Sequence, residues 1–261
     1  MKIKKMKFLY LILILLINIS CIAQDESILK KSNISLIKTV FSNNIDTVDS
    51  KYNGTWAGIE IGFNNYFNSS KKSFDLSENE NYLEIKPWKS RVININLIEF
   101  NLGIIKKSFG ITTGCGIEIN NFLFSQNITL VSDSLRLNYF QDTINTFSKN
   151  KLTTLFVSVP LLLEWHLSSK KNKSIAFISL GIIGSVNIDN YTSQRYSINN
   201  VEYKSRIRDN YWIAPYWYGL TARFGYSFIR FFANYSLMPL FEINKGPTLY
   251  LVSAGVIIVG F

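Results

Sequence analysis

The chain has 261 residues, of which 47% are hydrophobic and 15% aromatic, and its formal net charge is +10. This length suits one large domain. The basic residues are spread over turns and loops, such as Lys71 and Lys72 or Lys106 and Lys107, rather than gathered in one patch with aromatic residues, which argues against a nucleic-acid partner. One histidine and two cysteines cannot make a usual zinc site, so no metal or other cofactor is predicted.

Residues 1–23 have the pattern of a secretory signal peptide. Basic residues precede an apolar stretch from Phe8 to Ile17, and Cys21-Ile22-Ala23 forms a cleavage site of the small-residue type. The stretch is too short for a transmembrane helix, and no other run reaches about 18 apolar residues. A lipoprotein signal with Cys21 acylated is the alternative. Both predict export, and cleavage would remove four lysines and no acid, which lowers the charge from +10 to +6.

Residues 24–53 are polar and irregular, and we interpret them as a periplasmic lead-in that is flexible or contains one short helix. The remainder, 54–261, is predicted to be a single β domain. After cleavage at Ala23, Cys115 is the one cysteine left, so no internal disulfide holds this domain together.

Eight segments of the β domain alternate with period two and predict strands. In the hairpin near the end of the chain, Leu220 and Phe224 lie on an apolar face, while Thr221 and Arg223 lie on a mixed face. The alternation changes parity near Leu97-Ile98, as a β-bulge would cause. The segment 174–189 is apolar on both faces, so its register stays open. The predicted strands are 55–66, 91–104, 108–122, 152–167, 174–189, 216–226, 230–237 and 249–261.

The connections between these strands alternate between long and short. The long ones are 67–90, 123–151 and 190–214, and the short ones are 105–107, 168–173 and 227–229. An even number of antiparallel strands with short turns at one end and long loops at the other is typical of bacterial outer-membrane barrels. We therefore predict an all-β fold, an eight-stranded antiparallel up-and-down transmembrane β-barrel in the outer membrane. It would be a monomer with both termini in the periplasm.

Short apolar motifs carry a family resemblance. The strand Ser158–Glu164, with Pro160 inside an apolar run, resembles the I-P-L-L-L-K strand of small outer-membrane β-barrel proteins, the PorT-like and OmpA-like eight-stranded barrels. Gly181 with Gly184, the Gly225-Tyr226 pair and the final Gly260-Phe261 also resemble that family, whereas Glu164 stands where a basic residue is common. The resemblance implies that Phe261 is the signal read by the barrel-insertion machinery, which would be a partner during assembly.

The predicted barrel has an interior just wide enough for side chains, and charged residues placed there need partners. We expect a structural polar network that closes the barrel; a narrow ion path is the alternative. The residues predicted to point inward and to form this network are Glu60, Glu99, Glu118, Glu164, Arg223, Arg230 and His166.

A catalytic site is not predicted. Ser158, Glu164 and His166 could be written as a triad, but they lie along one strand, where alternate residues are about 6.8 Å apart and a triad needs hydrogen bonds of about 3 Å. We therefore expect no enzyme.

Three function classes stay open. The favoured one is a structural or binding barrel whose loops 123–151 and 190–214 meet an extracellular partner or a secretion apparatus. The second is a narrow channel or transport-related barrel. The third is a soluble lipocalin-like barrel, which would place the face of Tyr218, Leu220 and Phe224 inside and leave Glu60, Glu118 and Arg223 outside.

Overall fold

The computed structural model describes residues 52–68, 76, 80–105, 107–133, 135–143, 147–168, 174–198 and 201–260. The predicted signal peptide, nearly all of the lead-in 24–53 and the terminal Phe261 lie outside these residues, so the statements about them stay predictions. Residues 51–261 form one compact unit, and the fold is described for that unit.

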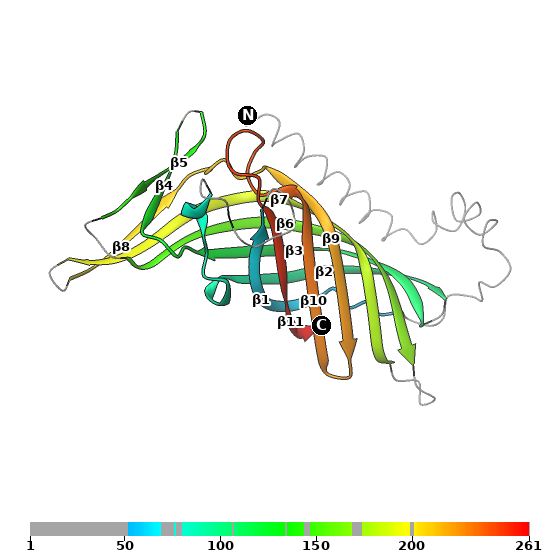
Figure 1. The fold of residues 1–261 in the computed structure, drawn as a ribbon. Coiled ribbons are helices and arrows are strands. Elements are labelled where there is room, and N and C mark those ends of the chain that lie inside the picture. Colours follow the sequence, from blue (N-terminus) through cyan, green and yellow to red (C-terminus); the bar gives the residue numbers. More distant parts are fainter. Residues whose placement is uncertain are drawn as a thin grey trace. The chain divides into compact units, whose positions relative to one another are not determined.

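Eight antiparallel strands of this unit form a closed ring (Figure 1). Going round the ring, each strand pairs with the next, and β11 closes it by pairing with β1. The predicted fold is therefore confirmed. The ring contains β1 (Gly58–Phe67), β2 (Arg91–Ile105), β3 (Phe109–Leu123), β6 (Phe147–Ser168), β7 (Ser174–Ile198), β9 (Tyr216–Tyr226), β10 (Ile229–Pro239) and β11 (Tyr250–Gly260).

The two faces of each strand differ in polarity as the alternation predicts. On β9, Leu220 and Phe224 are 50% and 46% exposed on the outside, while Thr221 and Arg223 are buried inside. An apolar exterior with a polar interior is the arrangement of a barrel in lipid. The soluble lipocalin-like alternative is wrong, because it requires these two sets of side chains to change places.

Two bulges set the register. In β2 the pairing with β3 shifts between Asn96 and Ile98, which confirms the predicted change of parity. In β7, Asn187 and Asp189 lie opposite consecutive residues of β6, so Ile188 is the extra residue. The inward positions of β7 change there from odd to even numbers. The register of the residues before this bulge was left open for another reason, because apolar residues occur at both odd and even positions.

Two ranges expected to be loops contain strands. Within 123–151 lies the hairpin of β4 (Ile128–Ser132) and β5 (Leu137–Gln141), and within 190–214 lies β8 (Val201–Arg208). In addition, β6 and β7 are 22 and 25 residues long, far more than the roughly 9–11 that cross a bilayer. The prediction of plain loops is wrong. β4 buries Ile128 and Leu130 on one face, and the apolar residues of β8 alternate with charged ones, but these period-two patterns are only five and eight residues long and lie within polar connections.

The ring has a turn end and a loop end. At the turn end, β9 and β10 are joined by Ser227 and Phe228, with Ser227 at φ 56°. At the loop end lie the short 3₁₀ helices η1 (Asn81–Leu83) and η2 (Pro87–Lys89), the β4–β5 hairpin, β8 and the β10–β11 connection (Figure 1). Among the described residues, no helix is long and apolar enough to cross a membrane.

Candidate functional site

The chain ahead of β1 lies inside the barrel. We call Tyr52–Ala57 the luminal segment. Its backbone has no strand partner, and carboxylates of the wall accept its N–H groups instead: Trp56 and Ala57 each donate to Glu99 Oε2 at 2.6 Å. Thr55 donates its backbone N–H and its hydroxyl to Glu164 Oε2 at 3.2 and 3.0 Å. Charged acceptors thus satisfy amides that would otherwise be buried without a partner.

Glycines on the inward face of β3 make room for the luminal segment. A Cβ atom at Gly110 would lie 2.7 Å from the ring of Tyr52, and one at Gly114 would lie 2.5 Å from the ring of Trp56. Both rings therefore fit against bare backbone. Larger inward residues at these positions of β3 would fill the space that the segment occupies.

A buried ion pair lies in the half of the interior near the turn end. Arg223 Nη1 lies 2.5 Å from Glu60 Oε1, and both side chains are fully buried. The amides of Asn94 and Asn96 also donate to Glu60, at 2.8 and 2.9 Å. The Arg223 guanidinium lies 4.4 Å from the ring centroid of Trp56, so it links the wall to the luminal segment. The two amides satisfy the carboxylate of the buried pair, whereas Arg223 Nε has no hydrogen-bond partner among the described residues.

The histidine lies near the turn end. His166 Nε2 is 3.0 Å from Glu164 Oε1, and the imidazole meets the ring of Tyr52 edge-on at 5.4 Å. Two neighbours along the strand therefore do reach each other, which the distance argument had not expected. Ser158 lies apart from this pair and shares a hydrogen bond of 2.8 Å with Ser185, so the three residues do not form a triad.

The remaining predicted residues differ in their placement. Glu118 is buried and accepts a hydrogen bond of 2.6 Å from Asn120, which in turn accepts one from Asn64. Arg230 is half-buried beside the β9–β10 turn, and no described contact joins it to the acids of the network. The structure thus gathers Glu60, Glu99, Glu164, Arg223 and His166 around the luminal segment, with Glu118 farther along the lumen.

The luminal segment was not predicted from the sequence. The predicted end of the lead-in, residue 53, lies inside this segment. The signal was present in β3, whose inward positions include Gly110, Gly114 and Gly116. A row of inward residues without side chains indicates that something else fills the lumen.

At the loop end, a cluster of apolar side chains covers the lumen. We call this cluster the loop cap. Its side chains form one continuous cluster with inward residues of the barrel such as Phe156 and Trp217, whose rings lie 6.5 Å apart. Ile128, Ile213 and Leu249 are completely buried in it. The cap is built from Leu83, Ile85, Phe124, Ile128, Leu130, Leu137, Tyr211, Ile213, Leu240, Phe241 and Leu249.

Tyr82 extends the cap at its edge. Its ring stacks on that of Tyr139 with centroids 4.2 Å apart, which joins η1 to the β4–β5 hairpin. Burial, together with neighbouring Tyr139 and Glu80, raises the pKa of Tyr82 to about 12. The cap therefore keeps this phenol neutral at alkaline pH values at which an exposed tyrosine ionises.

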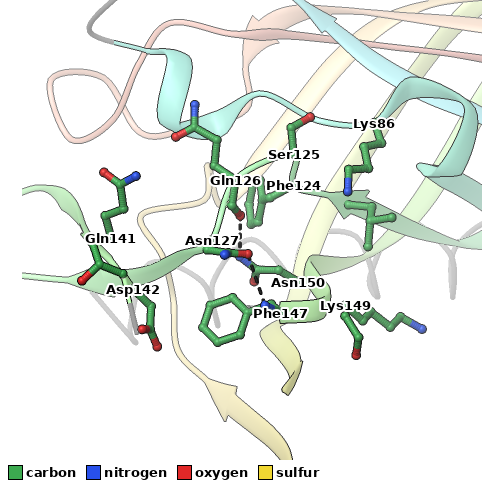
Figure 2. Close-up of a pocket in the computed structure, with 13 residues that line it drawn as sticks. Lys86, Phe124, Ser125, Gln126, Asn127, Gln141, Asp142, Phe147, Lys149 and Asn150 are labelled. Carbon is green, nitrogen blue, oxygen red and sulfur yellow. Dashed lines mark hydrogen bonds between the residues drawn. The ribbon is translucent and has the colours of Figure 1, made fainter. Parts of the chain in front are cut away.

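Beside the cap, a polar pocket of about 650 Å³ opens between the end of β3, the β4–β5 hairpin and the start of β6 (Figure 2). Asn127 Oδ1 accepts the Phe147 N–H at 3.2 Å, and the Asn150 amide donates to Gln126 O at the same distance. The pocket offers amide groups and the amines of Lys86 and Lys149, which suit hydrogen bonding to a polar ligand. Among the described residues, no group of three metal-ligating side chains is present.

A closed eight-stranded barrel with an apolar exterior and a filled polar interior defines an integral outer-membrane β-barrel protein. The chain belongs to the family of the outer membrane protein beta-barrel domain, whose model matches residues 39–242. The match thus includes the luminal segment and the ring from β1 to β10. Comparisons with curated proteins and with solved structures gave no match. The narrower PorT-like and OmpA-like resemblance stays a prediction.

Proposed function

We propose that this outer-membrane barrel is closed and acts as a structural or binding protein through its loop end. The observation that carries the proposal is the double closure of one lumen. The luminal segment, bound to Glu99, Glu164 and Arg223, fills the half near the turn end. The apolar loop cap covers the other half. Together they leave the loops as the surface that meets other molecules.

In this proposal the turn end faces the periplasm, together with both termini, and the loop end faces outward. The barrel works as a monomer, Phe261 is read by the insertion machinery, and the loop cap with its polar pocket meets an extracellular or secretion partner. Catalysis has no part. His166 packs between the rings of Tyr52 and Phe177 and contacts the Glu164 carboxylate, which suits a structural role.

The rival function, a narrow channel, is favoured by one wall of the lumen. The side chains of Ser179, Thr221 and Asn234, on β7, β9 and β10, carry buried polar atoms without a hydrogen-bond partner among the described residues. Buried polar groups of this kind are normally satisfied by water. Ions could move along such a hydrated path beside the luminal segment while the segment stays in place.

Conductance in planar lipid bilayers separates the two functions. The folded barrel, verified by its faster electrophoretic migration before boiling, should give no stable single-channel steps. Gly54→Val should give brief openings, because a Cβ atom at Gly54 would overlap the side chains of Asn101 and Thr112. Thr112 is completely buried in the wall and cannot give way easily, so the luminal segment should move instead.

Gly184→Val is the matched control, since a Cβ atom at Gly184 meets nothing within 4 Å. It should remain as silent as the unaltered chain. Steady steps from the unaltered barrel would refute closure and establish the channel. Silence of Gly54→Val together with an unchanged heat shift would show that the luminal segment is not what closes the lumen.

A further inference from the structure

Three strands continue beyond the barrel as a sheet that we call the blade. It consists of residues 147–155 of β6, 189–198 of β7 and all of β8, with β7 in the middle (Figure 1). One face of the blade packs toward the loop cap, where the Gln194 amide donates to Ile128 O and Thr129 Oγ1 at 3.0 Å. The other face points away from the lumen.

Cations gather on this outer face in cross-strand rows. In the first row Lys149, Arg195 and Lys204 lie directly opposite one another. In the second row, Lys151 of β6 and Arg206 of β8 lie on either side of Ser193 of β7. Arg208, two residues further along β8, lies opposite Tyr191. We call these six cations the basic face. They come from two ranges expected to be loops. The prediction that the basic residues are spread over the surface was therefore wrong for these six.

The carboxylates on this face do not balance the cations. Glu202 lies 3.6 Å from Arg195, and Asp189 lies 3.3 Å from Arg208, so two acids meet six cations. Like charges directly opposite each other in a sheet destabilise it. The first row alone sets three cations side by side, an arrangement that an anionic ligand would stabilise.

Several of these cations are held in place by their neighbours. The Arg206 guanidinium lies 3.6 Å from the ring centroid of Tyr191, and Lys151 Nζ donates to Asn121 Oδ1 at 2.6 Å. Burial, followed by the charges of Lys149 and Arg206, lowers the pKa of Lys151. The basic face is therefore a positioned group of donors and not a set of extended, independent side chains.

The height of the basic face above the apolar belt identifies its surroundings. Lys149 and Lys151 lie on the same face of β6 as the exposed Leu161, Leu163 and Trp165. The apolar outward positions of β6 end at Leu155. With a rise of roughly 3.3 Å per residue and a tilt of about 45°, Lys151 lies about 9 Å above Leu155. That height corresponds to the headgroup layer of the bilayer.

We propose that the basic face binds the phosphate groups of a phosphorylated glycolipid in the outer leaflet. The inference rests on the proposed function, because it requires the loop end to face outward. Arginine forks pair with phosphate oxygens in bidentate fashion, and lysines add point charges. Continuity with the lipid-facing surface of β6 favours a membrane lipid over a dissolved anion.

Native mass spectrometry of the full chain in detergent tests this proposal, with diphosphorylated lipid A and its dephosphorylated form as probes. The phosphorylated lipid should bind at least tenfold more tightly. The double variant Lys204→Gln with Arg206→Gln should weaken that binding by roughly tenfold or more. The control, Lys89→Gln with Lys107→Gln, removes the same charge from exposed positions outside the basic face and should change it less than twofold.

Equal affinity for the two lipids, or equal weakening by both double variants, would overturn the proposal. So would an oligonucleotide or inorganic phosphate that competes as well as the phosphorylated lipid.

Orientation is tested separately: in a Cys115→Ala background, Val201→Cys on the blade should react with an impermeant maleimide on intact cells. Failure of that labelling, with lipid discrimination intact in detergent, would refute the outward loop end and not the phosphate chemistry of the basic face.

Discussion

The two closures of the lumen use different physics. Near the turn end, the luminal segment is held by directional contacts: a carboxylate accepts two amides at 2.6 Å, and an ion pair of 2.5 Å lies beside the Trp56 ring. At the loop end, the cap is a cluster of aliphatic and aromatic side chains from four separate connections. The first closure depends on each partner, whereas the second depends on the total apolar surface that is buried.

This difference predicts how each closure fails. A charge deprived of its partner in the interior is costly wherever it sits, so damage near the turn end should lower the stability of the whole barrel. Connections that fold on top of a finished sheet can open locally without unfolding it. Damage to the cap should therefore leave the ring intact.

The largest effect is expected at the buried ion pair of Glu60 and Arg223. Arg223→Met leaves Glu60 buried without its cation and should destabilise the barrel by about 3–5 kcal/mol in urea titrations in lipid vesicles. The double variant Glu60→Gln with Arg223→Met removes both charges; the single glutamine oxygen can accept from Asn94, while Asn96 keeps Trp56 O as an acceptor. It should recover most of the loss. Equal destabilisation by the single and double variants would show that packing of Arg223 on Trp56, and not charge, matters here.

A smaller and more local effect is expected in the cap. Ile213 is completely buried, and Ile213→Ala should lower the free energy of cap opening by roughly 2–4 kcal/mol. Limited proteolysis should cut the loop-end connections faster while the heat shift of the barrel is unchanged. Ile243→Ala is the control, because Ile243 is 77% exposed in the same cap region. Loss of the heat shift in Ile213→Ala would mean that cap and ring unfold together.

The contrast between the closures also explains what the sequence could and could not predict. The inward position of Glu60, Glu164 and Arg223 follows from period-two alternation, because one face of every spanning strand must be apolar in lipid. The bulge beside Leu97 was predictable for the same reason. Within the membrane, the requirement for an apolar exterior marks the strands and their register.

Outside the membrane that requirement ends. The blade strands carry charged or polar residues on their outer face, such as Arg195, Lys204 and Arg206. β8 does alternate with period two, but its charged face does not fit a strand in lipid, and the segment was predicted to be part of a loop. The six cations become one surface only after β6, β7 and β8 pair. The cap residues likewise come from connections far apart in the chain, and their contacts follow from tertiary packing rather than from a local period.

The smallest effect is expected from pH. Tyr82 ionises in the cap only at about pH 12, whereas in an unfolded connection its pKa returns to the usual 10.0. Because the folded-state pKa is raised, the contribution of the neutral phenol is fully present below pH 10 and is lost as the pH rises from 10 to about 12. The melting temperature of the cap, measured by near-ultraviolet circular dichroism, should stay constant from pH 8 to 10 and then fall. The melting temperature of Tyr82→Phe should fall less over the same range, because phenylalanine has no proton to lose at this position. Equal losses in the two chains would show that the stacked phenol does not couple cap stability to pH.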